Sequence, residues 1–356
     1  MAETAKRAFI AAVVVGGVVV LALALWKLRL LISLVFFAFI IAAAMRPGVD
    51  ALRRRGIPRG LGIAIHYGGL FGLIALLLWA AVPRAVTQIG DAVDELPSSE
   101  DELQEAAQES TGLEHDILVG IQRRLEDLPS ADELVDPALE IGLLGFEILI
   151  GAFFVLAMGA YWIFERERAV TLVTSLLPRP RRKKVRDTWD LIDAKMGAYV
   201  RGQALLILLV GTVLSLCFWA IGLPFWILIG AFAGVVELIP VIGPLAAGAL
   251  AVGVGLTVSW QVALAAAVIV FVVRMVEDYV VIPRVLGDAV GLSPLLVLFS
   301  VTAVALLFGE FAVLLAIPIA AVAATLVDVI VRGKDPAEEE VPTVIFAAKE
   351  GETVGR

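Results

Sequence analysis

The stretch that decides the fold is Phe225–Val258, with the sequence FWILIGAFAGVVELIPVIGPLAAGALAVGVGLTV. It is almost entirely apolar and exceeds the roughly 20 residues that a helix needs to cross the hydrocarbon of a bilayer. Pro240 and Pro244 each remove a backbone donor and clash with the preceding turn, so a helix here must break. We therefore predict two half-length helices that meet at a tip containing Pro240, Gly243 and Pro244, which makes a re-entrant hairpin. At membrane depth such a break is tolerated only where it packs in protein or lines a wet cavity.

The composition places the chain among membrane proteins. Hydrophobic residues make up 60% of its 356 residues, charged residues make up 18%, and the mean hydropathy is +0.95. Soluble domains are roughly half apolar and a quarter charged. We therefore predict an all-α polytopic membrane protein that contacts the lipid bilayer. The formal net charge of −8 gives no support to nucleic-acid binding, and the single cysteine, Cys217, excludes an intrachain disulfide and a cysteine-based metal site.

About eight hydrophobic segments are expected, counting the broken ones. The expected single spans are Ala8–Trp26, Leu30–Met45, Leu61–Val82, Ala138–Phe164, Ala204–Ile221 and Val262–Ile282. Basic loops follow the second and the fourth of these spans. Because positively charged loops stay in the cytoplasm, we expect both loops and the N-terminus inside.

A second long apolar region, Leu292–Val331, is also too long for a single span. It is interrupted at Gly309 and Glu310 and again at Pro318, which predicts a second hairpin-like element that opens to the inside and returns the C-terminus there. Two broken segments, one open to each side, suit alternating access around a site at the midplane. This pattern favours transport. For each broken segment, a pair of short tilted spans is the alternative.

Changes in charge and hydropathy divide the chain into regions. These are 1–82, the first three spans with a basic inner loop; 83–137, an acidic extracytoplasmic region of amphipathic helices; 138–164, the fourth span; 165–203, a basic cytoplasmic loop with an amphipathic helix; 204–331, a transport core with two broken hairpins; and 332–356, a loose acidic C-terminal tail. The acidic region is a vestibule that attracts cations or, as we favour, the solvated face of packed helices. We attribute the positive charge of the basic loop to membrane topology and to packing within the protein rather than to recognition of a specific lipid.

Charged residues within the apolar segments are candidates for a site. Glu277 and Asp278 lie three and four positions after Arg274, so both can reach the arginine along a helix. Charges near mid-membrane are costly unless paired or hydrated and mark a functional site by default. A buried structural pair near the inner interface is the alternative. Glu237, beside the first break, is either an ion- or proton-coupled carboxylate or a brace for the proline tip.

Several motifs together resemble a known family. The run ELIPVIGP at Glu237–Pro244 is similar to the signature of the autoinducer-2 exporter family of membrane transporters, and YVRGQ at Tyr199–Gln203 resembles the family's arginine-glycine-glutamine motif. The other matching blocks are EDYVVIPRVLG at Glu277–Gly287, which includes Pro283, Arg284 and Gly287, LSPL at Leu292–Leu295 and LAIP at Leu315–Pro318. The turn at Gly309–Ala312 departs from the pattern, because the family usually has a second glycine there.

The resemblance implies a secondary transporter, or permease, of eight segments that forms a homo-oligomer in the cytoplasmic (inner) membrane of a prokaryote. Family members are associated with export of a small quorum-sensing molecule or with sodium or lithium/proton antiport. An antiporter needs a carboxylate that exchanges a proton for a monovalent cation, and the candidates are Glu237, Glu277 and Asp278. An exporter of a small polar solute needs hydrogen-bond donors, and the candidates are Arg201, Gln203 and Arg274.

Functions of other classes find less support. The only histidines are His66 and His115, and no HExxH or GxxxxGK[ST] motif is present, so neither a metal-dependent hydrolase nor an ATP-driven pump is indicated. We expect no enzyme, no cofactor and no metal site. A non-transporting membrane scaffold or accessory protein remains an alternative, with the basic amphipathic helix and the acidic region as docking surfaces.

Overall fold

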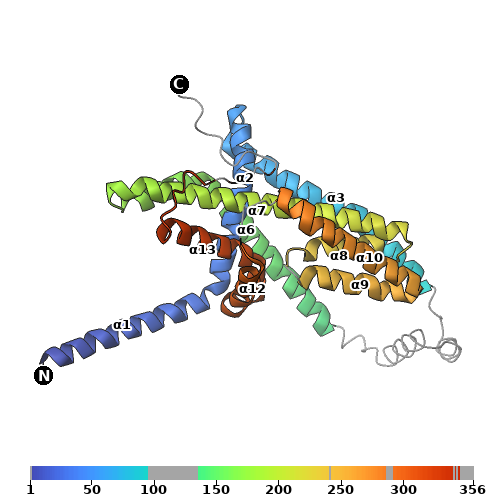
Figure 1. The fold of residues 1–356 in the computed structure, drawn as a ribbon, viewed down its shortest axis with the longest axis horizontal. Coiled ribbons are helices and arrows are strands. Elements are labelled where there is room, and N and C mark those ends of the chain that lie inside the picture. The colour runs from blue at the N-terminus through green and yellow to red at the C-terminus, as the bar shows by residue number, and fades with distance from the viewer. Residues whose placement is uncertain are drawn as a thin grey trace. The chain divides into compact units, whose positions relative to one another are not determined.

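The computed structural model describes residues 2–94, 135–239, 242–285, 292–339, 341 and 344. Helices account for nearly all of this described part (Figure 1), which confirms the predicted all-α class. The elements are α1 (Ala2–Lys27), α2 (Arg29–Arg54), α3 (Arg59–Asp94), α6 (Val135–Ser175), α7 (Arg179–Ala220), α8 (Trp226–Val236), α9 (Ile242–Val258), α10 (Trp260–Val276), the π-helix η1 (Glu277–Val281), α11 (Ile282–Val285), α12 (Pro294–Phe308), the 3₁₀-helix η3 (Glu310–Leu315) and α13 (Ala316–Ile330). Most of the predicted acidic region, 95–134, lies outside the described residues.

Six helical stretches of the described chain are long and apolar enough to cross a membrane. They are Phe9–Lys27, Arg29–Arg54, Arg59–Trp79, Gly145–Ser175, Arg179–Ala220 and Glu310–Ile330. The apolar helices α8, α9 and most of α12 are shorter. Length and composition thus confirm a polytopic membrane protein, and the largely exposed apolar side chains of α1 suit contact with lipid.

The chain divides into two compact units. The first unit comprises Met1–Pro47, Gly151–Val200 and Asp288–Arg356, and the second comprises Gly48–Ile150 and Arg201–Gly287. Helices α2, α6 and α7 each contribute residues to both units. The first broken segment belongs to the second unit, and the other broken segment belongs to the first.

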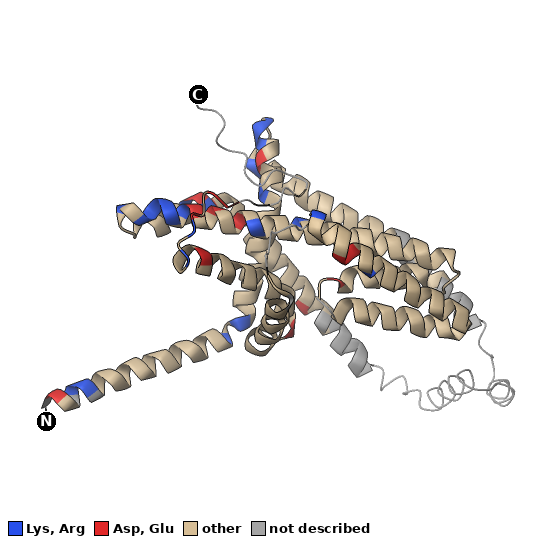
Figure 2. Ribbon diagram, viewed as in Figure 1, with Lys and Arg blue, Asp and Glu red and all other residues tan. Residues whose placement is uncertain are grey.

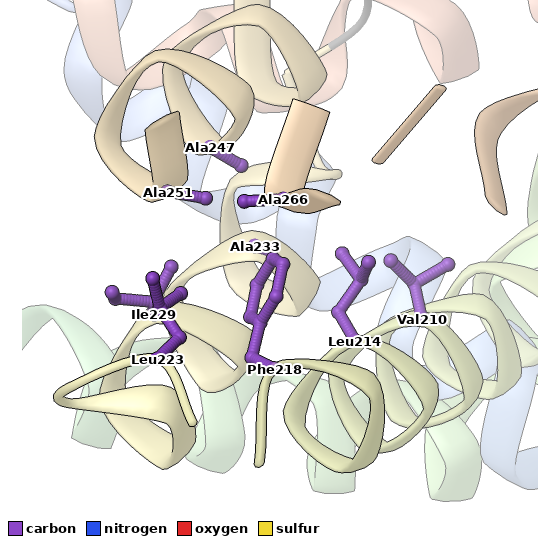
Figure 3. Packing of buried hydrophobic residues seen from close by; sticks show 9 residues of the cluster. All are labelled: Val210, Leu214, Phe218, Leu223, Ile229, Ala233, Ala247, Ala251 and Ala266. Carbon is purple, nitrogen blue, oxygen red and sulfur yellow. The ribbon is translucent and has the colours of Figure 1, made fainter. Parts of the chain in front are cut away.

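The core of the second unit combines large side chains on α7 with alanines on the helices that follow. Figure 3 shows this cluster, which contains Val210, Leu214, Phe218, Leu223, Ile229, Ala233, Ala247, Ala251 and Ala266. Phe218 and Leu223 are fully buried. Helix α9 packs against both α8 and α10, so the two halves of the broken segment lie side by side.

Helices α7 and α8 approach closely because small residues line their contact. A Cβ atom on Gly234 would lie 2.6 Å from the carbonyl oxygen of Ile207 and 3.0 Å from Cα of Gly211. One turn earlier on α8, a Cβ atom on Gly230 would lie 2.6 Å from the backbone nitrogen of Ser215. Such spacing of small residues is typical of closely packed membrane helices, in which backbones meet directly.

The long apolar stretch breaks where its prolines predict. Helix α8 ends at Val236 and α9 begins at Ile242. Gly243 is buried, and a Cβ atom there would overlap the carbonyl group of Val236, so the turn between the helices requires a glycine. Pro240 lies outside the described residues. The break is confirmed, and its re-entrant path through a membrane stays a prediction.

The first unit contains a second cluster of buried apolar residues. Ile40 and Ala43 of α2 pack with Met196 of α7 and with Leu315 and Ala321 around the start of α13. Aromatic rings extend this contact. Phe37 and Phe311 meet edge to face with their ring centroids 6.0 Å apart, and Trp162 lies against both Phe39 and Trp189. Helices α2 and α6 are therefore joined by direct packing to the amphipathic part of α7.

The second broken segment is interrupted at the predicted glycine. Gly309 has a φ of 93°, which L side chains rarely adopt, and it separates α12 from the 3₁₀-helix η3. Helices α12 and α13 pack against each other. Pro318 does not lie in the interruption: it is buried in the first turn of α13, a position at which helices tolerate proline.

Two polar segments are well ordered where the structure describes them. The amphipathic helix and the fifth span form one continuous helix, α7, because no proline separates them and a single glycine, Gly202, weakens a helix by only about 1 kcal/mol. The C-terminal segment is also not loose where it is described, since Pro336 and Val344 are buried and Lys195 pairs with Glu339 at 3.2 Å. The polar end of α7 thus holds part of that segment.

Candidate functional site

Arg274 stands at the end of an apolar helix that begins with a defined cap. The Ser259 hydroxyl accepts a hydrogen bond from the Val262 N–H and starts α10. Ala263 and Ala266 are buried against neighbouring helices, and a Cβ atom on Gly255 of α9 would lie 2.7 Å from Cα of Ala263. This tight antiparallel contact between α9 and α10 brings the end of α10 back beside the start of α9.

Three carboxylates surround the guanidinium of Arg274. Its Nη1 donates to Glu237 Oε1 at 2.8 Å and to Glu277 Oε2 at 3.3 Å. Its Nε and Nη2 reach Asp278 at 3.1 and 2.9 Å. We call these four residues the Arg274 cluster. The contacts to Glu277 and Asp278 confirm the pairing expected from helical spacing, and the contact to Glu237 adds the broken segment.

Burial differs among the members of the cluster. The side chains of Glu237 and Glu277 are only 9% and 3% exposed, whereas those of Arg274 and Asp278 are 30% and 36% exposed. Glu277 Oε1 is buried and has no hydrogen-bond partner among the described residues. A buried carboxylate oxygen without a donor is costly, so this oxygen marks the place where the cluster is incomplete.

The charges of the cluster do not balance. With every group ionised, one arginine faces three carboxylates, and 1 − 3 leaves a net charge of −2. In a weakly polar environment, uncompensated charge is unfavourable. The cluster is therefore suited to take up a positive charge.

A π-helix carries two of the three carboxylates. Glu277 and Asp278 begin η1, and the Ile282 N–H donates to the Glu277 carbonyl, five residues earlier. Pro283 follows directly and has no N–H to donate to Tyr279, which helps to explain why regular α-helical bonding ends here. Single π-helical turns are frequent at functional sites.

Gln203 supports the broken segment from α7. Its side chain is buried, and Nε2 donates to the backbone carbonyl of Glu237 at 3.3 Å. The last carbonyls of a helix lack helical donors, so this bond stabilises the end of α8. Arg201, one half-turn earlier, is also buried. The arginine-glycine-glutamine motif therefore lies in the same unit as the Arg274 cluster and contacts it through Gln203.

The remaining predicted site residues lie elsewhere or outside the described chain. Pro283 and Arg284 are exposed on α11, and Arg284 makes no ion pair with a described residue. Pro244 is partly buried in the first turn of α9. Gly287 lies outside the described residues. Gly309, Glu310 and Pro318 belong to the first unit, with Glu310 exposed.

A second charged cluster, in the first unit, was not expected from the sequence. The buried guanidinium of Arg166 on α6 pairs with Asp190 and Asp193 of α7 and with Glu167 at 3.0 Å. Arg46 of α2 also reaches Asp193, at 3.3 Å. The signal available in the sequence was the presence of acids within a strongly basic loop. Unlike the Arg274 cluster, this one is near charge balance once Arg186, which pairs with Glu167, is included.

The family model of AI-2E family transporters matches residues 15–332. The chain belongs to this family. That match covers both broken segments, the Arg274 cluster and the continuous helix α7, and it confirms the resemblance noted in the motifs. The helices and the family together make the protein a multi-pass membrane protein of a transporter family.

Curated relatives carry names of the same kind. "Putative transport protein YrrI" of Bacillus subtilis (strain 168) is 25% identical over 302 residues, which are 82% of this chain and 86% of that protein. "Putative transport protein YueF" of the same organism is 25% identical over 82% of this chain and 83% of its own length. "Putative transport protein MT0215" of Mycobacterium tuberculosis (strain CDC 1551 / Oshkosh) is 25% identical over 93% of this chain and 91% of its own length.

Proposed function

We propose that this protein is a secondary transporter that moves a small solute or ion by alternating access, with the Arg274 cluster as its coupling site. One observation carries the proposal: carboxylates from the broken segment and from η1 share a single arginine, and one buried carboxylate oxygen has no described donor. Intramembrane charges of this kind are typical of ion and proton pathways. Broken helices beside them are typical of transporter binding sites.

The geometry supports a mechanism in which charge controls a contact between helices. Arg274 ties the end of α10 to Glu237, the residue that follows α8. A proton or monovalent cation bound by Glu277 or Glu237 reduces the attraction of that carboxylate for Arg274. The arginine then keeps fewer partners, and the broken segment is freer to move relative to α10. In this mechanism Asp278, which is more exposed, retains the arginine during the exchange.

Sodium or lithium/proton antiport is the form of transport that the cluster favours. Antiport needs a carboxylate that can be occupied either by a proton or by a cation, and the unpartnered Oε1 of Glu277 offers such a position. Export of a small polar solute, such as a quorum-sensing molecule, is the second candidate. It is supported by the buried donors of Arg201 and Gln203 beside the same broken segment.

The proposal also specifies the membrane and the orientation of the chain in it. We place both termini in the cytoplasm, because the basic residues concentrate in the loops between α2 and α3 and between α6 and α7. The membrane is the cytoplasmic membrane of a prokaryote, and the broken segments open to opposite sides of it. A homo-oligomer is proposed from the family resemblance alone.

The experiment that tests transport uses proteoliposomes containing only the purified protein. A pH gradient is imposed, sodium or lithium is added outside, and the internal pH is followed with a trapped dye. Collapse of the gradient on cation addition would establish antiport. Absence of a cation response together with uptake of a small polar solute would support export instead. Absence of any flux would contradict a transport function and support a scaffold or accessory role.

A further inference from the structure

The end of the α6–α7 pair carries a dense group of exposed basic residues. Figure 2 shows positive charge gathered where these two helices meet. We call this group the basic tip, and it consists of Arg179, Arg181, Arg182, Lys183 and Lys184, all exposed. Among the described residues, none of them lies within 4.0 Å of an acidic side chain. Arg182 differs from the others because it donates to the carbonyls of Ser175 and Leu177 and so closes the end of α6.

Several other basic residues of the same unit are paired. Arg46, Arg166 and Arg186 bind carboxylates of α6 and α7, and Lys195 and Lys334 both reach Glu339. Pairing of this kind satisfies basic side chains within the protein. The basic tip is therefore a group of five neighbouring basic residues without a described acidic partner. Lys27 and Arg29, where α1 meets α2, also lack such a partner but are only two.

The stability of α7 does not explain these charges. The basic tip occupies the first turns of α7, and its first turn contains no acidic residue. Cations at the N-terminal end of a helix oppose the helix dipole and cost about 0.3–1 kcal/mol each at exposed positions. The arrangement is thus unfavourable for the isolated helix, and an external anion would offset it.

Apolar side chains are exposed beside the basic tip. Leu172 and Leu176, at the end of α6, are 65% and 80% exposed. A combination of cations and leucines is typical of protein segments at the membrane interface, where the charges meet headgroups and the leucines enter the boundary of the acyl chains. A soluble acidic partner would attract the charges but would not by itself account for the leucines.

We propose that the basic tip binds the headgroups of anionic lipids. The helical stretch Gly145–Ser175 is long and apolar enough to cross a membrane, and it ends four residues before Arg179, so the tip follows directly on a candidate membrane span. Each basic residue near an anionic surface contributes about 1 kcal/mol of attraction, and this attraction is screened within about 8 Å at physiological salt. The tip would thereby fix the orientation of the α6–α7 pair relative to the membrane.

A fluorescent label on the tip provides the test. Full-length protein with Ser175→Cys and Cys217→Ser is labelled with a polarity-sensitive dye and placed in nanodiscs of phosphatidylcholine, with or without phosphatidylglycerol. We expect the emission to shift to the blue only when phosphatidylglycerol is present. With all basic residues of the tip intact, raising the salt concentration should remove that blue shift, because salt screens the attraction between the tip and the anionic headgroups.

Two variants complete the design. Replacing Arg179, Arg181, Lys183 and Lys184 with glutamine should abolish the shift, while Arg182 is kept because it closes α6. The matched control, Arg53→Gln with Arg55→Gln in the other basic loop, should retain it. Thermal unfolding in detergent verifies that each variant is folded. Equal emission in the two lipid compositions would overturn the proposal and would favour a soluble acidic partner. A blue shift that survives in the tip variant would also overturn it.

Discussion

Nη1 of Arg274 lies 2.8 Å from Oε1 of Glu237, and this ion pair connects the end of α10 to the break between α8 and α9. The two residues are far apart in sequence; the side chain of Glu237 is 9% exposed and that of Arg274 is 30% exposed. The same nitrogen also contacts Glu277. Arg274 therefore holds together two carboxylates that would repel each other without it.

Arg274→Gln should destabilise the protein strongly, because it leaves three carboxylates without their shared cation. Removal of one partner from a buried ion pair costs about 3–5 kcal/mol, and we expect a value near the lower end because Arg274 is partly exposed. Thermal unfolding of purified protein measures the effect. Adding Glu277→Gln to Arg274→Gln should restore part of the loss, since it removes one of the unpaired charges. Simple additivity of the two changes would show that these side chains are not coupled.

Gly234→Ala should separate α8 from α7. The new Cβ would meet backbone atoms of Ile207 and Gly211, which cannot turn aside as a side chain can. Overpacking of this kind costs about 1–3 kcal/mol. The matched control is Gly253→Ala in α9, which has open space around it and should be neutral or slightly stabilising. Equal unfolding temperatures for the two variants would contradict the close approach of α7 and α8.

Arg166→Met should destabilise the first unit, because it leaves Asp190 and Asp193 without their buried partner. The expected loss is about 3 kcal/mol or more. Arg168→Gln is the control, since Arg168 lies two positions away, is 83% exposed and pairs only with Glu165 in the described structure, so its loss should cost less than about 1 kcal/mol. Similar melting curves for both variants would argue against a structural role for the Arg166 ion pairs.

The contact of the C-terminal segment with α7 should weaken in acid. Partial burial favours the protonated form of Glu339, but hydrogen bonds and ion pairs with Lys195 and Lys334 outweigh burial and lower the pKa of Glu339 below its ordinary value. A lowered pKa means that the stabilisation is complete above the ordinary value and is lost as the pH falls through the lowered value. The protection factors of amides in the segment around Pro336, which correct for the slower intrinsic exchange in acid, should therefore fall over that acidic range. In Glu339→Gln, the protection factors should be lower already at neutral pH and should vary less with acidification.

The Arg274 cluster shows how far the sequence determines a site. The contacts of Arg274 with Glu277 and Asp278 follow from helical spacing, so they were predictable. The contact with Glu237 depends on how the broken segment folds back beside α10, and no local pattern specifies that arrangement. The sequence indicated Glu237 as a candidate because it lies beside the prolines, and the structure shows that Arg274 is its partner.

The limits of helical segments were less predictable than their existence. Prolines and glycines marked the break before Gly243 and the turn at Gly309, because each imposes a local backbone requirement. The change from polar to apolar residues near Tyr199 carried no such requirement, and α7 continues through it. The Arg166 ion pairs were missed for a related reason. The basic residues of this loop were explained by membrane topology alone, so the acidic residues that pair with them were not considered.

The most direct test of the account measures cation-dependent collapse of a pH gradient in proteoliposomes with Glu277→Gln and, as a control, Glu147→Gln. Glu147 is also a glutamate of an apolar helix, but its side chain is exposed and is not part of the Arg274 cluster. We predict that Glu277→Gln abolishes the response while Glu147→Gln retains it at a rate close to that of the unmodified protein. A normal response in a folded Glu277→Gln protein would contradict the assignment of the Arg274 cluster as the coupling site.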